Sequence, residues 1–384
     1  MRISRRHFVR DERGMSLVFV CLGFMAMLSA TTLAIDVGMF MNSRSQAQNA
    51  ADAGALAGAV ALVYNDFDNR TASGPAVQSA INTATTNRVA GGTVSVTPAD
   101  VTFPNDPSGQ PTRVQVQVFR TSERSNPVST LMGGFFGVPT ADIAAVATAE
   151  ATPANAETCV MPFTIPDRWN ENGKAWTPSD TFDPGDVYIP LKPDPDPNTY
   201  YTGYNAKRDK GLEIVLKASN DTNVTASWYN PWDLPGSVGA ADYRANIGGC
   251  NSAIIKPGDK MVPENGNMVG PTSQGMADRI ALDPGARWDG SPDGGCNCVQ
   301  GGDPKYRISP RIVIIPTYDP AIFAAGKQHG KGLDLQIVNF IGFFLEDMHG
   351  NDVVGRIIPV GGIIAANAGP APVGMFPKVV RLVQ

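Results

Sequence analysis

The sequence predicts an α+β protein in which a long N-terminal transmembrane helix precedes a small helix-plus-sheet domain and a larger, mainly-β, sandwich-like domain. Three observations lead to this prediction: an uncharged apolar run near the N-terminus, a proline-free helical stretch after it, and a turn-rich remainder. Gly and Pro supply 40 and 31 of the 384 residues, while 42% of residues are hydrophobic and 17% charged. This composition excludes a disordered or collagen-like chain.

The apolar run covers residues 14–35, between Arg13 and Asp36. At about 1.5 Å per residue it spans roughly 33 Å, enough for one membrane crossing. A cleaved secretory signal peptide also begins basic and turns apolar, and a buried core helix is a further alternative. The run is longer than the apolar part of a signal peptide and continues into helical sequence. We therefore expect an uncleaved anchor.

Residues 1–13 form a basic tip with a net charge of +3, because five arginines stand against Asp11 and Glu12. These topology residues are Arg2, Arg5, Arg6, Arg10 and Arg13. Arginines before the span predict a cytoplasmic N-terminus and a single-pass protein of the inner (cytoplasmic) membrane, with residues 37–384 periplasmic or otherwise extracytoplasmic. The whole chain carries −5, which leaves −8 beyond the tip and argues against nucleic-acid binding.

Strong helix formers continue beyond Asp36 without proline, so we expect the helix to reach about Tyr64. Small residues recur there at four-residue spacing, which allows another backbone to approach closely. They are Ala47, Ala51, Ala55 and Ala59 on one row and Ala50, Gly54 and Gly58 on the next. This face either docks partner helices of other membrane subunits or packs on the chain's own globular domain.

A family resemblance rests on three strings: Arg-Asp-Glu-Arg-Gly at 10–14, Ala-Ile-Asp-Val-Gly at 34–38, and Gln-Asn-Ala-Ala-Asp-Ala-Gly-Ala-Leu-Ala-Gly-Ala at 48–59. Residues 10–62 resemble the TadE/TadG-like N-terminal domain of TadG-like Flp (tight adherence) pilus-assembly proteins. The resemblance implies a membrane protein of that machine, with other Tad/Flp membrane proteins or pilins as partners. The N-terminus is also similar to that of a type IV pilin. Phe19 stands where processed pilins carry Glu, so we expect no cleavage after Gly14.

Residues 36–152 are expected to combine the small-residue helix with a small, pilin-like α+β domain. Apolar and polar residues alternate with period two over 112–120, which indicates a strand with one buried face. The other expected elements are helices over 74–92 and 127–136 and strands over 93–102 and 140–151.

Residues 153–384 differ in composition, since 24 of the 31 prolines and all five Trp lie there. Short apolar runs between Gly, Pro, Asp and Asn turns predict a β-sandwich or barrel. The expected strands are 187–191, 211–217, 224–229, 307–315, 332–344, 353–360 and 378–383. Residues 272–282 are expected to be a helix capped by Thr272 or Ser273. Phrases such as Asp283-Pro-Gly-Ala286 and Ser309-Pro-Arg-Ile-Val313 also resemble the extracytoplasmic region of TadG-related proteins.

Four of the five cysteines lie in this domain and Cys21 lies in the apolar run. An even number in an extracytoplasmic domain predicts disulfides among Cys159, Cys250, Cys296 and Cys298. A Cys296–Cys298 ring looks too small for good geometry, so we expect Cys159 and Cys250 each to pair with one of Cys296 and Cys298. A metal site is the alternative.

Other side chains suggest no catalytic centre. The acidic turns 194–198 and 289–293 offer oxygen ligands for Ca²⁺ but do not match an EF-hand, and solvated turns explain them better. Aromatic residues could form a glycan platform or fill a core, and the core is favoured; they are Trp169, Trp176, Tyr200, Tyr201, Tyr204, Trp228, Tyr229 and Trp232. His329 and His349 are expected at the surface. We expect no metal and no cofactor.

The leading hypothesis is a membrane-anchored, non-enzymatic structural or accessory component of pilus assembly that docks partner subunits through its N-terminal helix. The alternative is a membrane-anchored adhesin or glycan-binding module. No catalytic constellation in the sequence supports an enzyme.

Overall fold

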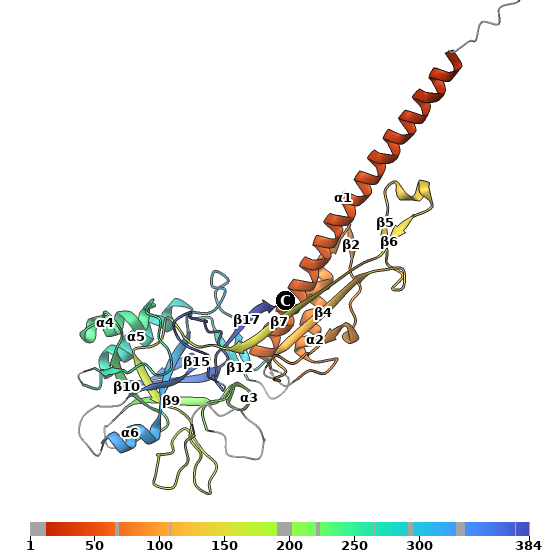
Figure 1. Cartoon of the computed structure of the whole chain (residues 1–384). Coiled ribbons are helices and arrows are strands. Elements are labelled where there is room, and N and C mark those ends of the chain that lie inside the picture. The colour runs from red at the N-terminus through yellow and green to blue at the C-terminus, as the bar shows by residue number, and fades with distance from the viewer. Residues whose placement is uncertain are drawn as a thin grey trace, which may run out of the picture.

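The computed structural model describes residues 13–65, 69–107, 109–189, 202–219, 223–264, 266–290, 295–327, 335–372 and 374–383. A long helix projects from a body of two parts, a proximal domain beside the helix and a distal domain at its far end (Figure 1). Residues 1–12 of the basic tip lie outside the described residues, and the expected role of the tip's arginines remains a prediction. Arg13 is the first residue of the helix.

Helix α1 (Arg13–Tyr64) is one uninterrupted element of 52 residues, which confirms the expected continuation to Tyr64. Its first half stands clear of the body, and its second half packs against helix α2 (Pro75–Thr86) and the proximal sheet (Figure 1). The apolar N-terminal half is long and apolar enough to cross a membrane.

The proximal sheet has four antiparallel strands in the order β17-β7-β4-β3. Their bounds are β3 Val101–Thr102, β4 Arg113–Arg120, β7 Ile143–Pro153 and β17 Lys378–Val383. Strand β4 alternates as its sequence predicts, because Val114, Val116 and Val118 are fully buried. These side chains join small residues of α1 and α2 in the proximal core.

Several expected elements of the proximal domain are shorter than the sequence suggests. The helix expected over 74–92 ends at Thr86, and the hairpin of β1 (Arg88–Val89) and β2 (Gly92–Thr93) follows it. The strand expected over 93–102 is divided by a 3-10 turn, η1 (Pro98–Asp100). The helix expected over 127–136 is wrong. This segment holds β5 (Val128–Ser129) and the 3-10 turn η2 (Gly133–Phe136), and β5 pairs with β6 (Thr140–Ala141).

The last strand corrects the expected domain organisation. The sequence predicts strand β17 as part of the distal domain, yet it pairs with β7 of the proximal sheet from Lys378↔Pro153 to Val383↔Thr148. The proximal domain therefore consists of residues 13–153 and 378–383, and the distal domain is inserted between β7 and β17. The two ends of this insertion meet, since the Ala154 N–H donates to the Pro377 carbonyl at 3.0 Å.

The distal sheet has seven strands in the order β11-β10-β8-β14-β15-β16-β9, and a further β10–β9 pairing closes it into a barrel-like ring. Barrel was one of the two expected architectures. The strand bounds are β8 Phe163–Pro166, β9 Glu213–Ala218, β10 Trp228–Asp233, β11 Val262–Pro263, β14 Ile312–Tyr318, β15 Ile337–His349 and β16 Asp352–Ile358. A separate hairpin joins β12 (Arg287–Asp289) to β13 (Cys298–Gln300).

In the described part of the distal domain, four helices accompany the barrel: α3 (Ala206–Asp209), α4 (Gly239–Gly248), α5 (Val269–Leu282) and α6 (Pro320–Lys327). Helix α5 begins three residues before the expected start, and neither expected cap is at its N-terminus. Thr272 is instead buried, and its hydroxyl shares a 2.9 Å hydrogen bond with that of Tyr243 in α4. Residues 187–189, the described part of an expected strand, contribute only the bridge Asn170↔Val187.

Most of the described aromatic residues fill the distal core, as favoured from the sequence. Trp169, Tyr204, Tyr229 and Trp232 are at most 3% exposed. Trp169 packs edge-on against Trp176, with ring centroids 6.1 Å apart. Tyr200 and Tyr201 lie outside the described residues.

Candidate interaction site on helix α1

The small-residue face of α1 is covered by the chain itself, which corrects the expectation that it docks partner helices. Its five alanines are at most 1% exposed, and their neighbours belong to α2 and the proximal sheet. This is the second of the two interpretations of the pattern. The set is Ala47, Ala50, Ala51, Gly54, Ala55, Gly58 and Ala59.

The two glycines show why this face needs small residues. A Cβ atom at Gly58 would lie 2.8 Å from Val114 Cγ1 and 3.2 Å from the Ala80 side chain. A Cβ at Gly54 would lie 3.0 Å from Ala84 Cβ. Contacts this short are repulsive, so the face is shaped to fit α2 and β4.

Farther toward the N-terminus, α1 presents its apolar side chains on all sides. Leu17, Phe19, Phe24 and Met27 are each more than 60% exposed. A helix that is apolar all round requires an apolar surrounding along its length. Phe19 lies on this exposed part of the helix, and Cys21, on the same part, is a free thiol.

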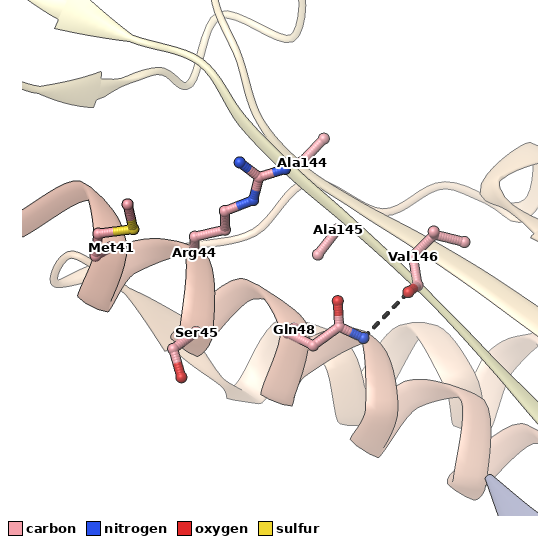
Figure 2. A pocket seen from close by; sticks show the side chains of 7 residues that line it. All are labelled: Met41, Arg44, Ser45, Gln48, Ala144, Ala145 and Val146. Carbon is pink, nitrogen blue, oxygen red and sulfur yellow. Dashed lines mark hydrogen bonds between the residues drawn. The ribbon is translucent and has the colours of Figure 1, made fainter. Parts of the chain in front are cut away.

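Between the buried and the fully exposed parts lies an open groove of about 530 Å³. The middle of α1 forms one wall and the beginning of β7 forms the other (Figure 2). Gln48 crosses the groove floor, where its side-chain amide donates to the Val146 carbonyl at 3.1 Å. The lining residues are Met41, Arg44, Ser45, Gln48, Ala144, Ala145 and Val146.

The β7 wall of the groove is a sheet edge that β17 leaves without a strand partner, although the Gln48 amide binds its Val146 carbonyl. Strand β4 pairs with β7 from Ile143 to Glu150, but β17 covers the other edge only from Thr148 onward. Within the described residues, 143–147 therefore have no strand partner on the side of β17. An edge of this kind offers backbone donors and acceptors to an added strand.

Asp36, the first charged residue after the apolar run, is fixed by a loop that is distant in sequence. Its carboxylate accepts the N–H groups of Leu131 (3.0 Å), Met132 (3.2 Å) and Gly133 (2.6 Å). Asp36 is only 6% exposed. The Asp-Val-Gly string is visible in the sequence but this contact is not, because the donors follow almost a hundred residues later.

The disulfide partners differ from the expected ones. Cys159 pairs with Cys250 and Cys296 pairs with Cys298, so the expectation of cross-pairing is wrong. The segments of Cys159 and Asn251 lie side by side, since the Cys159 N–H donates to the Asn251 carbonyl at 3.0 Å. Asn297 has a φ of +50°, and this turn brings the flanking cysteines to a Cα separation of 5.1 Å, within the normal range.

Other expected ligands do not assemble into a site. The acidic turn 194–198 and residues 291–293 of the second acidic turn lie outside the described residues, as does His329. The carboxylate of Asp289 is used within its own hairpin, where it accepts from Gln300 Nε2 at 3.1 Å. His349 is exposed at the end of β15, as expected. No group of three or more His, Cys, Asp or Glu suited to a metal ion occurs among the described residues.

Two buried carboxyl groups have strongly altered acidity. Burial raises the pKa of Asp167 to about 6, although hydrogen bonds from the Tyr204 N–H, the Tyr188 hydroxyl and the Arg168 N–H oppose the shift. This carboxylate is therefore well satisfied and ties residues 188 and 204 to the end of β8.

Burial raises the pKa of Glu157 to about 8, and Oε1 of Glu157 has no hydrogen-bond partner. Glu157 lies where the two domains join.

Two segments of the distal domain, residues 283–286 and 309–313, form one structural contact. Buried Arg311 donates to the carbonyls of Asp283 (3.1 Å) and Ala286 (2.8 Å). The Asp283 carboxylate accepts from the Ser309 hydroxyl at 2.6 Å. These residues therefore hold the loop after α5 against the start of β14.

Fold and site together define a protein with an exposed apolar helix of membrane-spanning length, continued by a helix-on-sheet domain that carries a larger barrel-like domain. Residues 14–61 match the family model described as putative Flp pilus-assembly TadE/G-like, in agreement with the resemblance found in the sequence. The match covers most of α1. Comparison with curated proteins and with solved structures gives no match. The family domain supports a role in pilus assembly.

Proposed function

We propose that the protein is a membrane-anchored, non-enzymatic structural component of Flp/Tad pilus assembly. The supporting observation is that the family match at 14–61 coincides with a single helix whose first half is exposed and apolar and whose second half is fixed in a folded domain. In this proposal residues 14–35 cross the inner membrane, the arginine-rich tip is cytoplasmic, and both domains are extracytoplasmic.

Partner docking is assigned to the groove between α1 and β7 in place of the buried small-residue face. An extended segment of another Tad/Flp membrane protein or pilin would pair with residues 143–147 of β7, on the same edge that β17 occupies from residue 148 onward. Three features support this choice: the edge lacks a strand partner in the described chain, Met41 and Val146 are 68% and 48% exposed, and Arg44 and Gln48 supply polar contacts. Strand addition of this type derives affinity from backbone hydrogen bonds.

The assembly role is tested by counting surface pili in a strain that lacks the protein. Loss of pili, with recovery when the full-length chain is supplied, is the expected result. Normal pili in the deletion strain would contradict the proposed function. A chain with the Met15–Ile35 run replaced by a cleavable signal peptide should be exported but should not restore pili.

The docking assignment is tested by a photo-crosslinking amino acid at Ser45 in the groove. Asn82, an exposed polar residue on α2, provides the matched control position. In cells that assemble pili, Ser45 should give an adduct that mass spectrometry identifies as a Tad/Flp membrane protein or pilin, and Asn82 should not. Equal labelling from both positions would reject the groove as the docking site.

The adhesin alternative receives no support from the described aromatic residues, because four of them are core residues with at most 3% exposure.

A further inference from the structure

The tip of the β5–β6 hairpin is an exposed apolar loop beside the membrane end of the molecule. Residues 125–141 contain no charged side chain. At the tip, Phe135 is 85% exposed, and Leu131, Phe136 and Val138 are 62%, 62% and 55% exposed. In Figure 1 this hairpin lies alongside the projecting part of α1 and points toward its N-terminal end.

Asp36 sets the position of this loop along α1. The apolar run ends at Ile35, and the next side chain, Asp36, binds the N–H groups of Leu131, Met132 and Gly133. The loop is therefore held at the level where the helix leaves the apolar part of a bilayer. A carboxylate that accepts several backbone N–H bonds is a strong and directional attachment.

Several polar backbone groups of the loop are satisfied within the protein, which favours burial in lipid. The Val138 N–H donates to the Gly133 carbonyl at 2.9 Å, and the Thr130 N–H donates to the Pro139 carbonyl at 3.0 Å. The Thr130 hydroxyl donates to the Val138 carbonyl at 2.8 Å. Gly137 closes the turn with a φ of +81°. The loop thus presents apolar side chains outward while these backbone groups are paired.

We propose that this loop, residues 131–138, inserts its apolar side chains into the lipid bilayer at the outer membrane boundary, next to α1. The occupant of the apolar surface is lipid because the loop continues the exposed apolar surface of a membrane-spanning helix at the same depth. A second, shallow attachment beside the helix would fix the tilt and rotation of the proximal domain on the membrane. The inference rests on the proposed membrane crossing of α1.

The test uses the full-length protein in liposomes, with Cys21→Ala removing the one free cysteine among the described residues. A fluorophore is attached in turn to Phe135→Cys, to Phe24→Cys in the apolar half of α1, and to Val238→Cys. Val238 is a matched apolar control, 81% exposed in the distal domain. Brominated lipids should quench most of the fluorescence at residues 24 and 135 and none at residue 238, whereas iodide in the buffer should quench only residue 238.

The outcomes separate the loop from the anchor. Lipid quenching at residue 24 with iodide quenching at residue 135 would overturn the loop proposal and leave the membrane crossing intact. Absence of lipid quenching at residue 24 would contradict the anchor on which the proposal rests. Shielding of residue 135 from both quenchers would show that protein covers the loop, and would also overturn the proposal.

The role of Asp36 is tested in the same assay. With the fluorophore at residue 135, Asp36→Ala should cause a loss of lipid quenching and a gain of iodide quenching, because the loop is released from the helix. Asp142→Ala is the matched control. Its carboxylate also accepts a backbone N–H, from Ser122 at 2.7 Å, but this donor lies outside the loop 131–138. Unchanged quenching in Asp36→Ala would reject Asp36 as the positioning residue.

Discussion

In the proximal core, the size of the side chain that fits at a position is limited by neighbouring atoms a few ångströms away. Gly58 is the tightest case on α1, because any side chain there would overlap Val114 of β4. We predict that Gly58→Ala destabilises the proximal domain by about 1–3 kcal/mol, as overpacking of a core does. Hydrogen exchange of α2 and β4 peptides in detergent micelles measures this effect.

Gly38, on the same helix, is the matched control for Gly58. A Cβ atom at Gly38 would have nothing within 4 Å. Gly38→Ala should leave protection unchanged or raise it slightly, since Ala is favoured over Gly in a helix by about 0.5–1 kcal/mol. Equal effects of the two substitutions would show that the close contact at residue 58 does not limit packing.

Glu157 predicts a pH dependence of stability. Burial raises the pKa of its carboxyl from 4.5 to about 8, and Tyr64 is the ionisable group that it influences at the domain junction. Between these two pH values the folded protein holds a proton that the unfolded chain has released. Stability therefore falls as the pH rises from about 4.5 to about 8, and this contribution is constant above that window.

The measurement is the melting temperature between pH 5 and pH 8 for the parent protein and for Glu157→Gln, which keeps the shape but does not titrate. We expect the parent to lose several degrees over this range and the variant to lose less. Glu123→Gln, on an exposed loop, should behave as the parent. Parallel curves for parent and Glu157→Gln would contradict the assignment.

At the scale of elements, β17 depends on a defined set of backbone hydrogen bonds to β7. Ala154 and Pro377 are a hydrogen-bonded pair, because the Ala154 N–H donates to the Pro377 carbonyl. In an antiparallel ladder every second residue pair exchanges backbone hydrogen bonds. Arg381 and Glu150 stand four positions along the ladder from Pro377 and Ala154, so they are also a hydrogen-bonded pair. The N–H of Leu382 consequently points away from β7.

Proline substitutions test this register. Arg381→Pro should cost about 1–3 kcal/mol because it leaves a carbonyl of β7 without its donor, whereas Leu382→Pro removes no ladder bond and should cost much less. Arg381→Ala separates the loss of the 3.6 Å ion pair with Glu150 from the backbone effect. Chemical unfolding of the full chain is the measurement, and a reversed order of the two proline variants would place β17 in another register.

The two disulfides should contribute unequally. Cys159–Cys250 spans a sequence separation of 91 and Cys296–Cys298 one of 2. Loop-closure entropy assigns about 4–5 kcal/mol to the first and about 1–2 kcal/mol to the second. Cys250→Ser should therefore lower the stability of the distal domain far more than Cys298→Ser, as measured by thermal unfolding. Peptide mapping without reductant should find no link between the two pairs, and such a link would disprove this connectivity.

What the sequence predicts well at this scale is local. The length of α1 and the alternation of β4 follow from periodicity and from the absence of proline, and both are confirmed. The pairing of β17 was missed because its apolar pattern marks a strand but does not identify the neighbouring strand. Cysteine pairing failed for a similar reason: Cα separations depend on loops that meet only in the folded domain.

For the candidate sites too, features set by neighbouring residues are predictable from the sequence, whereas contacts between distant residues are not. The small-residue face of α1 was recognised from its spacing, but spacing alone could not decide between a partner helix and α2. The Asp36 contact and the uncovered edge of β7 depend on residues brought together from distant parts of the chain. The sequence signal for the hairpin loop is its uncharged, apolar composition, which over 127–136 also favours a helix.

At the scale of the whole molecule, the distal domain is an insertion whose two ends meet at the rim of the proximal sheet. Further contacts cross the junction: the Lys210 ammonium donates to the Tyr64 carbonyl at the C-terminal end of α1 at 2.8 Å. A cation at this position also interacts favourably with the helix dipole. The proximal domain nevertheless has its own core of α1, α2 and the four-stranded sheet.

This arrangement predicts that the distal domain can be removed without unfolding the proximal one. Because β7 and β17 are antiparallel neighbours, replacing residues 155–376 with Asn-Gly, together with Pro377→Val, would join them by a two-residue hairpin turn. The valine supplies the N–H that this turn needs. We expect the shortened chain in micelles to keep the slow hydrogen exchange of α2 and β4. The same deletion joined by Pro-Pro is the control, since it cannot form the turn. If both shortened chains exchange rapidly throughout, the proximal core requires the distal domain for folding.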